Sequence, residues 1–533
     1  MSPTLLLIVF IAYTAMLFVI AWFTSRNADQ KAFYIGGRKS NWLLVAYGYI
    51  GTSLSGVTFM SVPGVVSKQN FYYAPMVFGF IFGYSIIAFV LIPLYYRLNL
   101  TSIYTYLEMR FGACSYKTGA SFFIISRVLG AAIRTYVVVM VLHVFVLEGM
   151  GVPFWVVGLV FILLAILYTY QGGVKTIIWT DTFQTTFMLL AGIVTIVVIV
   201  TKLDQSFFQM LGRIHDDGYT RIFDGDWSST TNFYKCFLAG VFTPIAMTGL
   251  DQGMMQKSLS CKNQREAQKN IILTIILIVI VNLMFLMLGA FLAVFCTTNG
   301  ISMADTDRIY PIVAFNHLGT FVGLCFFIGL ISAAYPSCAN ALTALTTSTC
   351  IDLIGLEKTI AGRNAPNVAG RNAPNVAGRN APISDWDDRR KKRVRIFVQC
   401  VITAVFLGII LLVKALKADA VINIVYAVAS YTYGPLLSLY LFGLFTKRRV
   451  IDVCVPMICI AAPLICLGIE YYNVIGRIVD CFRPTDAAPL QFSFGFALLL
   501  VNAGLTLIGL YVCSRKNQKS DGRGTVETVE NRK

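Results

Sequence analysis

Apolar stretches about 20 residues long recur along the whole sequence, and this feature constrains the fold more than any other. Each stretch can cross a hydrocarbon layer of about 30 Å as a helix that rises about 1.5 Å per residue. The chain is 57% hydrophobic and only 13% charged, a composition that argues against a soluble globular protein of 533 residues. The sequence therefore predicts an all-α integral membrane protein.

We predict about thirteen transmembrane helices, and no soluble domain interrupts the series. The first stretch has no preceding basic residue and no small-residue cleavage site, and it is too long for a signal-peptide core. We therefore expect it to be a retained helix. The predicted spans are 3–24, 42–67, 72–96, 119–147, 153–170, 176–202, 233–256, 270–297, 318–350, 395–415, 419–445, 451–472 and 489–513.

The net charge of +17 follows the predicted topology and does not indicate nucleic-acid binding. With the N-terminus outside, most basic residues fall in inside loops, as the positive-inside rule requires. The opposite loops carry more acids, among them Asp216, Asp226, Asp305 and Asp307. An odd number of helices then places the C-terminus inside. The predicted inside cations include Arg97, Arg110, Lys257, Lys262 and Lys447.

Neither the cysteines nor the one low-complexity segment indicates a functional site. The thirteen cysteines lack metal-ligand spacing and lie mostly within apolar spans. Only Cys296 and Cys481 lie near outside ends, and the sequence does not exclude a disulfide between them. Residues 361–384 contain three near-identical eight-residue units, each with a proline. Because proline interrupts helices and the unit is polar, we expect a flexible linker on the inside.

The second span carries a cluster of glycines and hydroxyl residues at its middle, where polar groups are costly and mark functional sites. This cluster reads Gly51-Thr52-Ser53-Leu54-Ser55-Gly56-Val57-Thr58. We expect a local break here, which would free backbone carbonyls beside the hydroxyls. A hard cation such as Na⁺ prefers oxygen ligands of this kind. Tight helix packing through small residues is the alternative.

Two further spans place cation-binding groups inside the membrane. The ninth span holds Pro336 in a run of small and polar residues, and a proline there releases the carbonyl of Ser332. The sixth span carries Asp181 near its start. Because an intramembrane carboxylate needs a cation, a proton or a strong donor nearby, Asp181 is a cation-site candidate.

The fourth span contains two arginines, Arg127 and Arg134, on one helix face. Arg127 lies close enough to the inside end for its side chain to snorkel to the interface. Arg134 does not, and burying it costs about 2.5–3.5 kcal/mol on insertion scales. We therefore expect Arg134 to face a wet cavity and an anion. A structural salt bridge, for example to Asp181, is the alternative.

Several strings, in this order and spacing, resemble the sodium:solute symporter family over roughly residues 1–515. Each string is weak alone, but together they make a specific match. They are Phe33-Tyr34-Ile35-Gly36-Gly37-Arg38, Tyr96-Arg97-Leu98-Asn99-Leu100-Thr101-Ser102, Tyr106-Leu107-Glu108-Met109-Arg110-Phe111, Tyr170-Gln171-Gly172-Gly173, Trp179-Thr180-Asp181 and Phe442-Gly443-Leu444-Phe445.

The resemblance implies a LeuT-type fold built from two inverted repeats of five helices each. The segments that follow from it are a leading helix and inside loop (1–41), the first repeat with helices two to six (42–203), an outside loop (204–232), the second repeat with helices seven to eleven (233–447), an inside linker within it (355–392), two trailing helices (448–515) and an inside polar tail (516–533).

The resemblance also implies sodium sites. The main site would take the carbonyls of Gly51, Leu54 and Ala333 and the hydroxyl of Ser337. The family usually has two adjacent hydroxyl residues here, and this chain has Pro336 in place of the first. Weaker sodium binding, another oxygen ligand and a register shift of one residue all stay open. Some members hold a second sodium, whose matching positions are Thr58, Asp181 and Asn340.

The matching substrate positions favour a carboxylate. In sugar-transporting relatives an acid and amides contact the substrate, and Val77, Pro244 and Tyr426 stand at those positions, which disfavours a hexose. In relatives that carry sialic acid, an arginine binds the carboxylate, and Arg134 falls at that position. The resemblance adds the hydroxyl residues Ser53, Ser55 and Thr58 to this cavity.

We therefore expect sodium-coupled symport of a small organic solute across a cell membrane, favouring an organic carboxylate such as sialic acid. Sodium is the expected co-transported ion, and the lipid bilayer is the expected environment, with no nucleic-acid partner. No set of nucleophile, base and third group gathers at the inner loops, so we expect no enzyme. Symport of a neutral sugar or amino acid, proton coupling through Asp181, and a channel or sensor are the alternatives.

Overall fold

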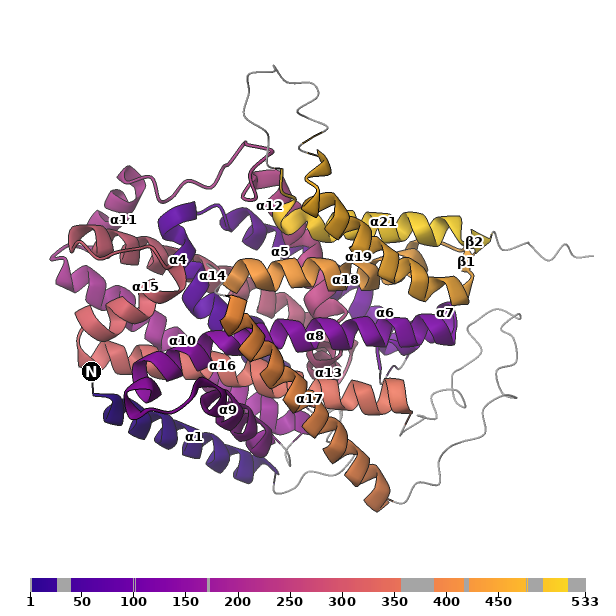
Figure 1. Ribbon diagram of the computed structural model, residues 1–533, viewed down its shortest axis with the longest axis horizontal. Coiled ribbons are helices and arrows are strands. Elements are labelled where there is room, and N and C mark those ends of the chain that lie inside the picture. Colours follow the sequence, from indigo (N-terminus) through magenta and orange to yellow (C-terminus); the bar gives the residue numbers. More distant parts are fainter. Residues whose placement is uncertain are drawn as a thin grey trace, which may run out of the picture.

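The computed structural model describes residues 2–25, 40–98, 100, 102–169, 173–355, 388–416, 421–475, 477 and 492–515. These residues are almost entirely helical, which confirms the all-α prediction. The tandem repeat at 361–384, Cys481 and the tail at 516–533 lie outside the described residues. Many of the helices run side by side along the longest axis of the molecule (Figure 1).

The first half of the chain contains a long leading helix, a broken second helix and three further long helices. Their bounds are α1 Pro3–Ser25, α3 Trp42–Ser53, α4 Gly56–Gln69, α5 Ala74–Ile86, η2 Ile87–Leu91, α6 Ile92–Arg97, α7 Thr105–Arg110, α8 Ala113–Leu142, η3 His143–Leu147, η4 Glu148–Met150, α9 Phe154–Thr169, α10 Gly173–Lys202 and α11 Phe207–Asp216.

The second half begins with another broken helix and ends with a two-residue strand pair. Its elements are α12 Phe233–Pro244, η5 Ile245–Gly249, α13 Gln252–Leu259, α14 Gln264–Thr298, α15 Thr306–Ile312, η6 Val313–His317, α16 Thr320–Ser348, η7 Thr349–Ile354, α17 Asp388–Leu416, α18 Val421–Phe445, β1 Arg449–Val450, η9 Asp452–Cys454, α19 Val455–Tyr471, η10 Gly495–Ala497, α21 Leu498–Val512 and β2 Ser514–Arg515.

The membrane-spanning helices can be compared with the thirteen predicted spans. Among the described residues, 10 helices are long and apolar enough to cross a membrane, or 12 if each of two bent pairs counts as one span. The remaining predicted span, 153–170, coincides with a shorter apolar helix, Phe154–Leu167. The chain is therefore a multi-pass helical membrane protein, and the count of thirteen stays a prediction.

Segments expected on the same side of the membrane lie at the same end of the molecule. Arg110 of α7 donates to the carbonyls of Thr446 and Arg448 at 2.6 and 3.1 Å, beside the β1–β2 pair. At the opposite end, Lys68 donates to the Ala304 carbonyl at 2.9 Å. Figure 1 shows α7, β1 and β2 at one end and α11 and α15 at the other. Which end is inside stays a prediction.

Candidate functional site

The second predicted span breaks where its glycines and hydroxyl residues cluster. Helix α3 ends at Ser53 and α4 begins at Gly56, and their axes differ by 58°. Leu54 and Ser55, between the two helices, have extended backbone conformations. The last carbonyls of α3 have no helical partner at such an end. The predicted break is confirmed.

A second break, which the sequence analysis missed, interrupts the seventh span. The segment Phe233–Gly249 and helix α13 meet at an angle of 72°. Asp251 caps α13, because its carboxylate accepts a hydrogen bond from the backbone N–H of Met254 at 2.9 Å. The signal in the sequence was an aspartate between Gly249 and Gly253, a pattern typical of a helix start.

One cavity lies between the two breaks and receives residues from both. Ser53, Thr58 and Arg134, three of the four predicted substrate residues, line this central cavity. Ser55 is buried and is not among the lining residues. The lining also includes Pro244 and Tyr426, two residues at the predicted sugar positions, whereas the third, Val77, is buried elsewhere in the core.

The two arginines of α8 have different environments. Arg127 is buried and forms an ion pair with Asp251, with a nitrogen–oxygen distance of 3.1 Å. The prediction that Arg127 snorkels is therefore wrong, because the acid at the second break holds its guanidinium inside the protein. Arg134 also lines the central cavity and has no ion-pair partner among the described residues. The alternative of a salt bridge between Arg134 and Asp181 is wrong as well.

The predicted main sodium ligands come from two helices that pack together, α3 and α16. Gly51 and Leu54 belong to the broken end of α3, where carbonyls are free. Ala333 and Ser337 are buried in α16, and the Ser337 hydroxyl has no hydrogen-bond partner within the described part of the chain. These groups fit a cation site chemically.

Pro336 does not break the ninth span. Helix α16 runs without interruption from Thr320 to Ser348, with Pro336 inside it. The proline removes only one N–H, that which would bond the Ser332 carbonyl. The surrounding helices bury this stretch completely and keep it helical, so only one carbonyl is released.

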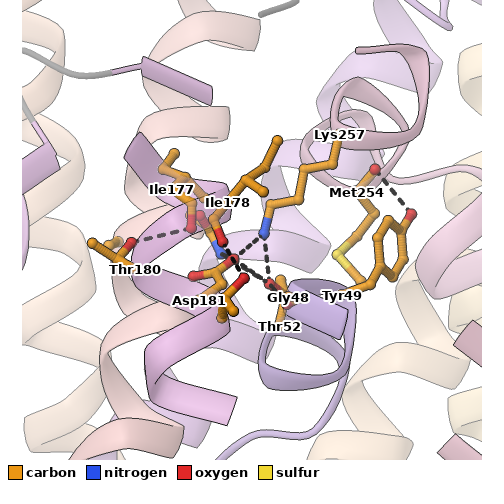
Figure 2. A network of polar contacts seen from close by, with 12 residues as sticks. Gly48, Tyr49, Thr52, Ile177, Ile178, Thr180, Asp181, Met254 and Lys257 are labelled. Atoms are coloured by element: carbon orange, nitrogen blue, oxygen red, sulfur yellow. Dashed lines mark hydrogen bonds and ion pairs between the residues drawn. The ribbon is translucent and has the colours of Figure 1, made fainter. Parts of the chain in front are cut away.

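Asp181 lies in a buried polar network that joins α3, α10 and α16 to α13, and Figure 2 shows Asp181, Thr52 and Lys257 of this network. Its carboxylate forms an ion pair with the ammonium of Lys257 and accepts a hydrogen bond from the Thr52 hydroxyl at 2.8 Å. The Asn340 amide approaches the same carboxylate oxygen at 3.4 Å and the Thr52 oxygen at 3.2 Å. Thr58, the other predicted second-sodium residue, has no hydrogen bond to Asp181 or Asn340 among the described residues.

The prediction that Lys257 is an inside loop cation is therefore wrong. Its side chain is buried in α13 and reaches Asp181 on α10. The second break caused the error, because a predicted span ending at residue 256 puts Lys257 in the loop. The cap at Asp251 was the signal that the helix restarts and carries Lys257 inward.

The family follows from a direct match. The model of the sodium:solute symporter family matches residues 33–351, which make up more than half of the chain. The chain belongs to this family. The matched region contains both breaks, the central cavity apart from Tyr426, and the Asp181 network.

Relatives of this chain are named for two different solutes, monocarboxylates and sialic acid. The sodium-coupled monocarboxylate transporter 1 of Homo sapiens is 26% identical over 341 residues, which cover 60% of this chain and 53% of the relative. The chain thus spans about half the length of that relative. The sodium/sialic acid symporter SiaT of Proteus mirabilis is 22% identical over 489 residues, covering 89% of this chain and 93% of the relative.

The fold also has a counterpart among solved structures. The substrate-bound outward-open state of a Na⁺-coupled sialic acid symporter matches with a TM-score of 0.73 at 18% identity. The match covers 95% of this chain and 97% of that structure. This likeness confirms the expected LeuT-type fold, while the helix count and the membrane topology stay predictions.

Proposed function

We propose that this chain is a sodium-coupled symporter of an organic carboxylate. The observation that carries the proposal is Arg134, whose side chain lines the central cavity beside the α3–α4 break without an ion-pair partner among the described residues. A cation in this position needs an anion, and a guanidinium can bind a carboxylate through two parallel hydrogen bonds. The names of the relatives, monocarboxylate and sialic acid symporters, support the same substrate class.

Hydroxyl groups beside Arg134 supply further contacts for such a substrate. Ser53 and Thr58 line the cavity from the two sides of the break, and Thr243 and Thr248 line it from the seventh span. Pro244 and Tyr426 stand where the resemblance expects sugar-binding groups, and a proline side chain offers no hydrogen bond. This set favours a carboxylate with additional polar groups over a hexose.

Sodium would bind next to the substrate in this scheme. The main site would use the carbonyls of Gly51, Leu54 and Ala333 and the hydroxyl of Ser337. Leu54 also lines the central cavity, so an ion at its carbonyl would lie close to the substrate. Occupation of the two sites would then be coupled electrostatically, since Na⁺ favours a nearby anion.

The internal repeat supplies the mechanical part of the proposal. We assign the two repeats to 42–203 and 233–447, with the N-terminus outside and the C-terminus inside. The first helix of each repeat is broken, at Leu54–Ser55 and at Leu250–Asp251, and such paired breaks are typical of transporters with inverted repeats. In alternating access, one part of the repeat core would rotate against the other, so that the central cavity opens to one side of the membrane at a time.

Uptake into proteoliposomes tests the proposal. The purified chain would be assayed with radiolabelled sialic acid, a short monocarboxylate, galactose and proline, with and without an inward sodium gradient. We expect sodium-driven uptake of a carboxylate. In Arg134→Ala, the KM for it should rise roughly ten- to hundredfold, because a hydrogen bond to a charged group is worth about 1.5–3 kcal/mol.

Arg308→Ala is the matched control, because Arg308 is an exposed arginine paired with Asp305 at the molecular surface. It should leave the KM unchanged. Uptake of a neutral solute that Arg134→Ala does not affect would refute the carboxylate assignment. Uptake that needs no sodium for any transported solute would refute the coupling, and a dependence on a proton gradient would replace it.

A further inference from the structure

The cation beside Asp181 belongs to the protein itself. Lys257 and Asp181 are only 3% and 1% exposed, and their ion pair joins α13 to α10. The Lys257 ammonium also donates to the Thr52 hydroxyl oxygen of α3. Figure 2 shows the lysine side chain descending from α13 onto the carboxylate and the threonine. The ammonium thus contacts two oxygen atoms that a bound Na⁺ would otherwise use.

The other groups that face the Asp181 carboxylate direct donors at it. One carboxylate oxygen of Asp181 receives the Lys257 ammonium and the Thr52 hydroxyl, and the Asn340 amide nitrogen also faces it, at 3.4 Å. A second cation at this place would meet an ammonium and an amide N–H₂ group where it needs oxygen atoms. The lysine therefore already supplies this carboxylate oxygen with the positive charge that a second Na⁺ would bring.

We propose that Lys257 is a tethered cation that takes the place of a second sodium ion at Asp181. This inference rests on the proposed sodium coupling and refines it. The transport cycle then uses sodium at the main site only. The second-sodium role that the family resemblance suggested for Asp181 and Asn340 is filled in this chain by its own lysine.

The surroundings of Lys257 would let sodium reach Asp181 if the lysine were removed. Lys257, Asn340 and Thr347 line one small cavity, and Thr347 also lines a neighbouring cavity with Ser102 and Asp352. Thr347 lies in the last turn of α16, Asp352 lies in η7 directly after it, and Ser102 precedes α7, so the two cavities follow the C-terminal end of α16. Removing the ammonium would leave a buried carboxylate beside a polar path, and Na⁺ is the available ion to neutralise it.

The test compares Lys257→Met with the native chain. Methionine has a similar length and no charge, so the variant keeps the volume and loses the cation. We expect the ratio of ²²Na⁺ to solute taken up by proteoliposomes to rise from about one to about two, with one more positive charge moved per cycle. In detergent, added NaCl should raise the melting temperature of Lys257→Met by several degrees more than that of the native chain, with N-methylglucamine chloride as the salt control.

Two further variants separate this inference from a purely structural ion pair. Lys257→Arg keeps the positive charge and should keep the native ratio of about one. The double variant Asp181→Asn with Lys257→Met removes both charges, which often has little effect on stability, and should also stay at about one. This double variant keeps the inference testable if Lys257→Met alone does not fold.

The outcomes distinguish a failure of the tethered cation from a failure of the proposed sodium coupling. A native ratio of two that falls to one in the double variant would overturn the tethered cation, because Asp181 would then bind sodium beside Lys257. A folded Lys257→Met chain without any additional sodium response would overturn it too. Absence of any sodium dependence in the native chain would instead refute the proposed function, and the inference with it.

Discussion

At the scale of single residues, the proposed main sodium site depends on the oxygen atoms available at positions 336 and 337. The Ser337 hydroxyl is buried and has no hydrogen-bond partner among the described residues, so it is free to bind a cation. Pro336 offers no side-chain oxygen and no backbone N–H. Because α16 remains helical through this point, a serine at position 336 would fit the same backbone.

Substitutions at these two positions should shift sodium affinity in opposite directions. Pro336→Ser adds a hydroxyl and should lower the half-saturating sodium concentration of uptake roughly tenfold, since a contact with a charged partner is worth about 1.5–3 kcal/mol. Ser337→Ala should raise it by a similar factor. Thr403→Ala on α17, whose hydroxyl bonds the Gln399 carbonyl of its own helix, is the control. Equal sodium dependence in all four proteins would place the main site elsewhere.

At the scale of elements, glycines set how closely the helices of the two proposed repeats approach each other. Helices α5 and α12 cross at Gly79 and Gly240. A Cβ at Gly79 would overlap the Phe237 carbonyl and lie 2.8 Å from the Gly240 backbone. Close approach through small residues is the usual packing of membrane helices, where no hydrophobic effect drives association. This crossing holds Pro244 and Met247 at the edge of the central cavity.

A methyl group at this crossing should destabilise the protein. We expect Gly79→Ala or Gly240→Ala to cost about 1–3 kcal/mol, because backbone atoms on the other helix cannot move aside as a flexible side chain can. Thermal unfolding of the detergent-purified chain measures the effect. Gly130→Ala in α8 is the matched control, because a Cβ there meets nothing within 4 Å. A melting temperature equal to that of the control would show that α5 and α12 separate at little cost.

At the scale of the whole molecule, charge divides the chain into two ends. Arg110, Arg448 and the β1–β2 pair gather at one end, whereas Asp224 and Asp226 belong to the loop between α11 and α12, and α11 lies at the other end (Figure 1). From the positive-inside rule we expect the first end to lie in the cytoplasm. The Ser228 hydroxyl donates to Asp226 in this exposed loop, which we expect outside, and Lys447 lies between α18 and β1, in a connection that we expect inside.

Cysteine labelling tests this orientation. In intact cells, Ser228→Cys should react with a membrane-impermeant maleimide, whereas Lys447→Cys should react only after permeabilisation, because the bilayer excludes the charged reagent. The native chain sets the background from its own cysteines. Labelling in the reverse pattern would invert the proposed topology and leave the fold unchanged.

The tethered cation would also determine what the whole molecule can accumulate. Transport of a monovalent anion with one Na⁺ moves no net charge, so only the sodium concentration gradient drives it. A tenfold gradient supplies about 1.4 kcal/mol. A second Na⁺ would add about the same free energy from its concentration gradient. It would also make the cycle carry one net charge, which adds about 2.3 kcal/mol per 100 mV of membrane potential. A chain with Lys257 at Asp181 would thus accumulate such a solute roughly tenfold and without a response to voltage.

The sequence by itself determined the features that depend on local composition. Apolar length predicted the spans, because a bilayer accepts only helices whose backbone groups bond internally. The glycines and hydroxyls from Gly51 to Thr58 predicted the first break, and Arg134 was recognised because no snorkelling route exists from its position. Asp181 was a candidate for the same reason.

Only the tertiary structure decided which charges meet. Asp181 and Lys257 are 76 residues apart in the chain, and Arg127 pairs with Asp251, whose position at a helix start does not by itself reveal its partner. Pro336 stays helical because neighbouring helices enclose it, although its local effect is to weaken a helix. The packing of α3, α10, α13 and α16 determines which buried charges lie close enough to pair, and pairing lowers the cost of burying them.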